Sequence, residues 1–167
     1  MTRRVASVLG SFLFFWIGPG TVAGLAPWLL TRWEPGPTLL GLDALRWVGV
    51  ALGLAGLVVV VESFARFALR GLGTPAPVAP TQHLVVSGLY RFVRNPMYVG
   101  VLGAIIGQAL LLGRRVLLGY AALAFVAFST FVALYEEPTL KRQFGREYDE
   151  YRAHVGRWWP RLTPWHP

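Results

Sequence analysis

The chain contains no cysteine and few charged residues. Without Cys among its 167 residues, disulfide bonds, thiolate metal sites and a cysteine nucleophile are all excluded. Only 14% of the residues are charged, whereas soluble domains contain about a quarter. So few charges cannot cover a water-facing surface, but lipid is a suitable solvent for a sequence that is 54% hydrophobic. The length is that of one domain, and we expect residues 1–167 to form a single membrane domain.

Acidic residues are also scarce, with 8 Asp and Glu against 16 Lys and Arg. The resulting net charge of +8 could indicate nucleic acid, but no nucleic-acid-binding motif is present, and basic residues at the ends of membrane helices explain it better. The histidines, His83, His154 and His166, have no metal-ligand spacing. We therefore expect neither a nucleic-acid partner nor a metal.

Four apolar segments are present, each close to the roughly 20 residues that cross a bilayer. They cover residues 5–30, 42–61, 97–113 and 116–135. The first contains Gly18-Pro19-Gly20, which predicts a break or kink. A signal peptide is the alternative for this segment, but the apolar run resumes at Leu25 and is too long for a signal core. The sequence thus predicts an all-α integral membrane protein with four transmembrane helices.

The basic residues predict the orientation of these helices. With a cytoplasmic N-terminus, the residues on the far side are Arg32, Arg46, Arg114 and Arg115, and the other 12 of the 16 (16 − 4) face the cytoplasm. The positive-inside rule therefore predicts an inner-membrane protein with both termini cytoplasmic. The long 70–95 loop lies on the same side, and because the opposite loops are short, we expect the functional site there.

Two helix starts can be predicted around this cytoplasmic face. Asn95-Pro96 is suited to begin the third span, with Asn as the cap and Pro in the first helical position. Pro138 is similarly suited to begin a new helix after the fourth span. Apolar residues then recur every three or four positions, which predicts one amphipathic helix lying against the loop or the headgroups, with Leu140, Phe144, Tyr148, Tyr151 and Val155 on one face.

Four polar residues are candidates for chemistry. Glu136 and Glu137 lie where the fourth span meets the cytoplasm, a position that suits an ammonium or sulfonium ligand, although solvated acids at a helix start are an equal alternative. Arg94 is either a snorkelling basic residue or a guanidinium that orients a carboxylate or phosphate. His83, alone in the loop, is more typical of a structural hydrogen-bonding group than of a catalyst.

The second half of the chain contains a series of motifs in a fixed order: His83-Leu84-Val85, Gly88-Leu89-Tyr90, Arg94-Asn95-Pro96-Met97-Tyr98, Glu136-Glu137, Phe144-Gly145 with Tyr148 and Tyr151, and Pro160. Together, these motifs resemble the isoprenylcysteine carboxyl methyltransferase family and the wider phospholipid methyltransferase-like membrane enzymes. The family carries His where this chain has Asn95. Asparagine hydrogen-bonds but does not titrate near neutral pH, so no proton transfer is expected at that position.

The resemblance implies a site for S-adenosylmethionine enclosed by the cytoplasmic loop and the C-terminal helix, within a methyltransferase-like core at residues 81–160. Residues 1–80 would supply two spans and the loop start, and residues 161–167 a tail. The implied catalytic residues are Arg94, Tyr98 and Glu137. The implied cofactor-binding residues are His83, Leu84, Val85, Gly88, Tyr90, Asn95, Pro96, Glu136 and Glu137.

The resemblance predicts methyl transfer to a membrane-soluble acceptor. A carboxylate of a lipidated, isoprenylcysteine-like substrate is the first expectation, and a phospholipid or other lipid amine or hydroxyl is the alternative. A carboxylate needs only alignment, whereas an amine needs a proton acceptor, which one of the two glutamates would provide. A non-catalytic four-helix membrane protein and a nicotinamide-dependent reductase remain alternatives of a different class. An acidic pocket would favour the sulfonium cofactor, and a basic pocket the dinucleotide.

Overall fold

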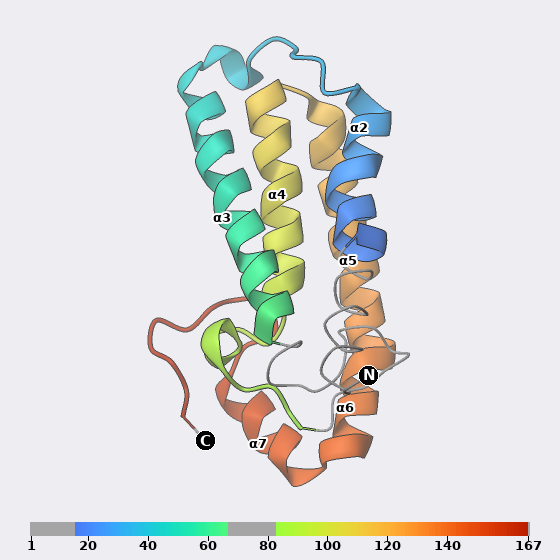
Figure 1. Ribbon diagram of the computed structural model, residues 1–167, viewed down its shortest axis with the longest axis vertical. Helices are drawn as coiled ribbons and strands as arrows, with labels where there is room; N and C mark the ends of the chain where they lie inside the picture. The colour runs from blue at the N-terminus through green and yellow to red at the C-terminus, as the bar shows by residue number, and fades with distance from the viewer. Residues whose placement is uncertain (1–15, 67–82, 167) are drawn as a thin grey trace, which may run out of the picture.

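The computed structural model describes residues 16–66 and 83–166. All regular secondary structure in these two ranges is helical, which confirms the all-α prediction. Figure 1 shows the main helical segments side by side, namely η1 (Trp16–Leu25), α2 (Ala26–Thr31), α3 (Ala44–Arg66), α4 (Pro96–Leu112) and α5 (Arg115–Phe131). A 3₁₀ turn, η2 (Leu39–Gly41), precedes α3. The predictions for Arg3, Arg4, Arg70 and residues 71–82 fall outside the described residues.

Within residues 16–66 and 83–166, two helices are long and apolar enough to cross a membrane. They are Ala44–Arg66, with a mean hydropathy of 2.2, and the continuous helix Arg115–Phe144, with a mean hydropathy of 2.1. α4 is also apolar, but its 17 residues are fewer than the roughly 20 that cross a bilayer. The first segment is described only from Trp16, where η1 continues through Pro19 with π-type hydrogen bonding. The predicted break at Gly18-Pro19-Gly20 therefore does not interrupt this helix. Crossing of the membrane by all four segments stays a prediction.

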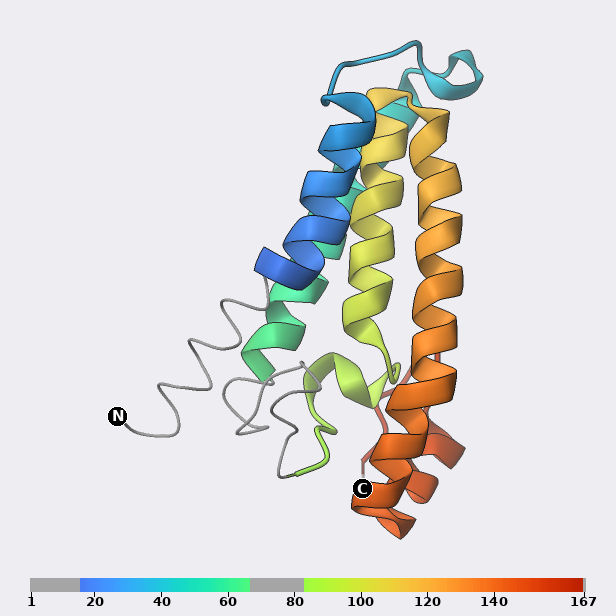
Figure 2. The ribbon, with the colours of Figure 1, turned by 90° about the vertical axis from the view of Figure 1, so that its right-hand side faces the viewer.

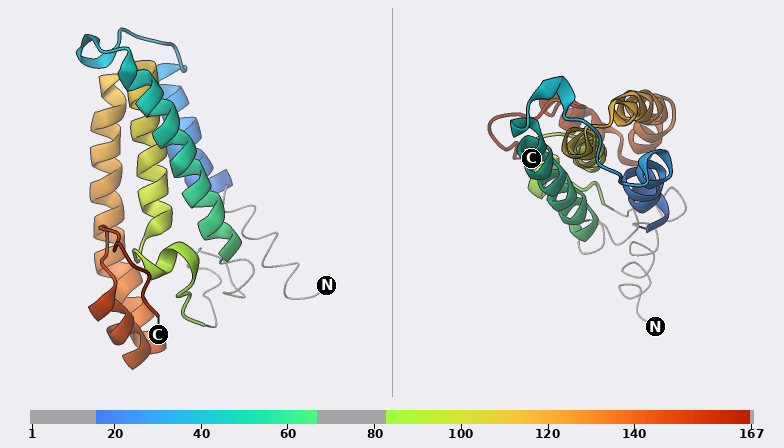
Figure 3. Two further views of the ribbon diagram at one scale, coloured as in Figure 1. Left: turned by 90° about the vertical axis from the view of Figure 1, so that its left-hand side faces the viewer. Right: turned by 90° about the horizontal axis from the view of Figure 1, so that it is seen from above.

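α4 lies at the centre of the bundle, in contact with α3, α5 and η1 (Figure 3, right). Its contact with α3 depends on glycines, since a Cβ on Gly56 would lie 2.5 Å from the Gly100 carbonyl oxygen. A Cβ on Gly107 would lie 2.5 Å from the Gly53 amide nitrogen. Small residues that allow two backbones to approach are typical of helix packing in membranes, where apolar side chains gain nothing by leaving lipid.

One end of the bundle extends beyond these helices. Figure 2 shows α5 continuing through a π-type turn, η5 (Val132–Glu136), into α6 (Glu137–Phe144) without changing direction. Pro138 lies in the first turn of α6, as predicted, but α6 is continuous with the fourth span and is not a new helix. Proline has no N–H for the preceding helical turn, and the wider π-type turn directly before α6 accommodates the missing hydrogen bond.

The chain instead turns at Gly145, with φ of 53° and ψ of −120°, between α6 and α7 (Arg146–His154). This conformation is open to glycine and rarely to other residues. The predicted single amphipathic helix is thus two helices joined at an angle. Their apolar residues still meet, because Tyr148, Tyr151 and Val155 form a buried cluster with Leu140, Phe144, Leu84 and Val86 packed against it. The prediction that this region lies against the loop is confirmed.

Candidate functional site

The predicted residues around Asn95 begin the site. Asn95 occupies the cap position of α4 and Pro96 the first helical position, as predicted. The Asn95 side chain, however, makes no capping hydrogen bond. Its amide donates to the Arg157 carbonyl oxygen at 3.1 Å, and the residue is 7% exposed. The capping prediction was therefore right in position and wrong in bonding, because the amide fixes the C-terminal segment instead.

A C-terminal strap, residues 156–165, runs beside residues 91–95. Backbone hydrogen bonds join the Arg94 amide to the Gly156 carbonyl oxygen, the Arg161 amide to that of Phe92, and the Trp165 amide to that of Arg91, each at 2.9 Å. These bonds place the Arg157 side chain next to Glu137, the first residue of α6. No sequence pattern predicted this pairing, because it joins segments about sixty residues apart through backbone atoms of ordinary loop residues.

Glu137 lies between two arginines. Arg94 Nη1 is 3.0 Å from its Oε1, and Arg157 donates to both carboxylate oxygens at 2.8 and 2.5 Å. The Arg94 and Glu137 side chains are each only 10% exposed. Arg94 also donates to the Tyr148 hydroxyl at 3.2 Å. Burial is the main cause that raises the pKa of Tyr148, and Glu137 adds to it, so this hydroxyl stays protonated at neutral pH.

Glu136 has a different environment although it is the next residue. Its Oε2 accepts a hydrogen bond from the Tyr98 hydroxyl at 3.1 Å. Within the described ranges this hydroxyl is its one partner, and no cation pairs with it. Tyr98 also contacts Phe128, with ring centroids 4.7 Å apart, and Trp158, at 6.4 Å. The two adjacent acids therefore differ: Glu137 is paired with arginines, whereas Glu136 is available to bind a ligand.

Arg94 retains an unused donor, since its Nε is buried and has no hydrogen-bond partner in the described part of the chain. A buried guanidinium N–H without an acceptor is unfavourable, and an anionic ligand would satisfy it. The cluster of Glu136, Glu137, Arg94 and Arg157 thus carries two negative and two positive charges. Its lining is neither purely acidic nor purely basic.

The remaining predicted residues lie along the segment that leads to α4. Val85 and Tyr90 are buried, and Gly88 has a positive φ of 58° at the start of a 3₁₀ turn, η4 (Gly88–Arg91). Tyr90 accepts a hydrogen bond at its carbonyl oxygen from the Tyr151 hydroxyl, at 2.6 Å. His83 is exposed and takes no part in the contacts of the acidic cluster. The structure therefore unites Arg94, Tyr98, Glu136 and Glu137 and leaves His83 apart.

Two residues of the cluster were missed from the sequence. Arg157 appeared only as one of many cytoplasmic arginines, although it makes the shortest contact with Glu137. Trp158 was not among the predicted site residues, but its ring packs against Phe125 at 5.3 Å and faces Tyr98. The Gly156-Arg157-Trp158 run after α7 would have been the available signal, as a turn residue followed by large side chains.

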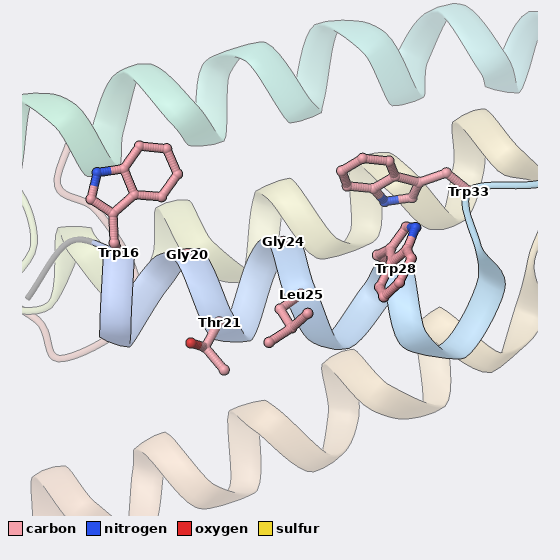
Figure 4. A pocket seen from close by; sticks show the side chains of 7 residues that line it. All are labelled: Trp16, Gly20, Thr21, Gly24, Leu25, Trp28 and Trp33. Atoms are coloured by element: carbon pink, nitrogen blue, oxygen red, sulfur yellow. The ribbon is translucent and has the colours of Figure 1, made fainter.

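A separate apolar groove of about 450 Å³ runs along the first helical segment. Figure 4 shows Trp16 and Trp33 projecting from one side of this segment, with Thr21 and Leu25 pointing the other way. The groove is lined by Trp16, Gly20, Thr21, Gly24, Leu25, Trp28 and Trp33. Such a lining suits a hydrocarbon chain rather than a polar cofactor, and the groove contains none of the predicted site residues.

We compared the chain with protein-family models, curated proteins and solved structures. No curated protein and no solved structure matches the chain. The phospholipid methyltransferase family, in contrast, matches residues 44–147, which is more than half of the chain. The match begins with α3 and ends in α7, so it includes Arg94, Tyr98, Glu136 and Glu137. With its apolar helices and this match, the chain belongs to the phospholipid methyltransferase family.

Proposed function

We propose that this protein transfers a methyl group from S-adenosylmethionine to a lipid acceptor at the cytoplasmic surface of a membrane. The observation that carries the proposal is the Glu136 carboxylate, which accepts a hydrogen bond from Tyr98 and has no cation partner among the described residues. Arg94, which pairs with the adjacent Glu137, has a buried Nε without an acceptor in the same residues. S-adenosylmethionine carries a sulfonium, an ammonium and a carboxylate. An uncompensated carboxylate suits the cationic part, and the Arg94 Nε suits the carboxylate, so the residues fit the cofactor.

The other predicted roles follow from position. Leu84, Val85, Gly88 and Tyr90 would contact the cofactor along the segment before α4, with Asn95 and Pro96 at its end and His83 at its exposed start. Glu137 would act through Arg94, whose guanidinium it orients, rather than by contacting the cofactor. Trp158 and Phe125 would shield the Tyr98 hydroxyl from water, which strengthens electrostatic contacts there.

The bound cofactor would supply an electrophilic methyl group for an in-line displacement. We propose a lipid amine as the acceptor, because the family is that of the phospholipid methyltransferases and because Glu136 is able to accept a proton. An amine attacks only as the free base, so its ammonium must lose a proton. Glu136 would take this proton and hold it, so that the neutral amine would have a free lone pair for the methyl group.

The carboxylate of a lipidated thioether remains the alternative acceptor, oriented by Arg94. The apolar groove along η1 and α2 supports a hydrocarbon-bearing acceptor in either case. The reductase alternative loses its support, because the family match indicates methyl transfer and the site is not a basic pocket.

Binding and transfer measurements together test the proposal. We would titrate S-adenosylmethionine into the detergent-purified protein by calorimetry and measure transfer of labelled methyl groups to phosphatidylethanolamine and to an isoprenylated cysteine. Saturable binding with labelling of the amine is expected, and labelling of the carboxylate alone would overturn the acceptor. If the folded protein does not bind S-adenosylmethionine even in the presence of lipid, the proposed function is refuted, and the non-catalytic membrane protein is the remaining alternative.

A further inference from the structure

Glu62 is a carboxylate in the last turns of α3, a helix that is otherwise apolar enough to cross a membrane. Ionisable residues in such helices are rare and commonly mark functional sites. The Glu62 Oε1 accepts a hydrogen bond from Arg66 Nε at 2.7 Å, one helical turn on. Its Oε2 is buried and has no hydrogen-bond partner in the part of the chain that the structure describes. One half of this carboxylate is thus used and the other is not.

The loop that leads to α4 lies directly against this ion pair. A Cβ on Gly88 would be 2.2 Å from Glu62 Oε1 and 2.7 Å from Arg66 Nε. Gly88 also has a φ of 58°, so both its backbone conformation and its surroundings require glycine. The neighbouring Ser87 has a buried hydroxyl that also lacks a partner in the described residues. The Glu62 Oε2 and the Ser87 hydroxyl, both without a partner in the described residues, thus belong to two segments that are in contact at Gly88.

Unsatisfied buried polar atoms are few in folded proteins, and each one calls for an explanation. Glu62 is already compensated by Arg66, so its free oxygen suits a neutral donor such as a hydroxyl rather than a second cation. Glu136, which has no cation partner in the described ranges, is suited instead to a cationic ligand. A carboxylate that accepts from ribose hydroxyls is a known solution in nucleotide sites of other folds.

We infer that Glu62, with Ser87, binds the ribose hydroxyls of the nucleoside part of S-adenosylmethionine. This inference rests on the proposed function and adds residues that neither the motifs nor the site cluster contain. The cofactor would then have its nucleoside near the end of α3 and its charged end at Glu136 and Arg94. The segment from Gly88 to Asn95 joins these two places along the chain.

The test uses the full-length protein in detergent and the stable product analogue S-adenosylhomocysteine. Calorimetry would compare the wild type with Glu62→Leu and Ser87→Ala, using both the analogue and its 2′-deoxy form. We expect Glu62→Leu to weaken binding of the analogue about 10- to 100-fold, because a hydrogen bond to a charged group is lost. Ser87→Ala should weaken it by roughly 3- to 10-fold. Both variants should lose little further affinity when the 2′-deoxy form replaces the analogue.

Arg66→Gln is the matched control, because it breaks the same ion pair and leaves both unsatisfied oxygens in place. If Glu62 only anchors Arg66, Arg66→Gln and Glu62→Leu should change binding equally, and the inference would be wrong. Thermal unfolding of the ligand-free protein gives a second readout. Ser87→Ala should be at least as stable as the wild type, since it removes an unsatisfied hydroxyl.

The outcomes separate this inference from the proposed function. If the wild type binds the analogue and both variants bind it equally well, the ribose contact is refuted while the methyltransferase proposal stands. If the wild type does not bind it at all, both fall. Glu62→Gln serves in place of Glu62→Leu if the latter does not fold, with weaker binding again expected.

Discussion

The two adjacent glutamates should respond to the same substitution in opposite ways. Glu137 is buried between two arginines, and it holds Arg157 through two hydrogen bonds of 2.8 and 2.5 Å. Glu137→Gln removes the charge that compensates Arg94, whose side chain is 10% exposed. Glu136→Gln removes a charge whose one described partner is a neutral hydroxyl, and the amide oxygen can still accept from Tyr98.

The magnitudes follow from burial. Removing one partner of a buried ion pair costs about 3–5 kcal/mol, but Arg157 is 36% exposed and can recover part of its hydration. We therefore expect Glu137→Gln to destabilise the protein by about 2–3 kcal/mol, which lowers its melting temperature by roughly 5–10 °C. Glu136→Gln should change stability by less than about 1 kcal/mol, yet weaken S-adenosylmethionine binding by about 10- to 100-fold.

The assay combines thermal unfolding, followed by tryptophan fluorescence in detergent, with calorimetric titration of the cofactor. Glu147→Gln, an exposed acid on α7, is the control for a change of net charge alone. The reasoning would be refuted if Glu137→Gln kept the wild-type melting temperature and abolished binding while Glu136→Gln bound normally. That result would assign the cofactor's cationic end to Glu137 and would mean that its arginine partners are displaced on binding.

Three further predictions concern helix packing, the turn at Gly145 and the effect of pH on stability. Gly56→Ala should destabilise the bundle by about 2 kcal/mol or more, because the added Cβ would lie 2.5 Å from the Gly100 carbonyl oxygen. Gly53→Ala is the control and should be near neutral, because a Cβ there has nothing within 4 Å; thermal unfolding of both variants checks this. Gly145→Ala should cost about 1–2 kcal/mol through its φ of 53°, measured in the same way, and an unchanged melting temperature would contradict the turn. Burial raises the pKa of Tyr151, so the protonated hydroxyl contributes fully to stability below the unfolded-state pKa of about 10, and this contribution is lost as the pH rises above that value. The melting temperature measured from pH 8 to 11 should therefore fall, and it should fall less for Tyr151→Phe.

Local patterns predicted the helices and the residues that begin them. The apolar segments found their counterparts in α3, α4 and α5, and Pro96 begins α4 as expected. These features depend on a few neighbouring residues, through hydrophobicity and the fixed φ of proline. Pro138 also lies in the first turn of α6, but the sequence did not predict that a wider turn would join α6 to α5 as one long helix.

Features that depend on distant segments were not predictable. Asn95 has every property of a helix cap, yet its amide is used by the strap sixty residues later. Gly145 falls within the amphipathic helix predicted after Pro138, but the chain turns there, and Tyr148 and Tyr151 form their buried cluster from a second helix. Sequence spacing could not separate these outcomes, because each is decided by which partner the folded chain brings near.

The three carboxylates of this region show why composition alone could not assign the site. Glu137 has two cationic partners, Glu62 has one, and Glu136 has none in the described part of the chain. The number of compensating cations decides what a carboxylate can still bind. A doubly paired one is structural, a singly paired one suits neutral hydroxyls, and an unpaired one suits a cation that loses water as it enters. On this argument we propose that Glu136, which has no arginine partner among the described residues, is the residue that binds the sulfonium.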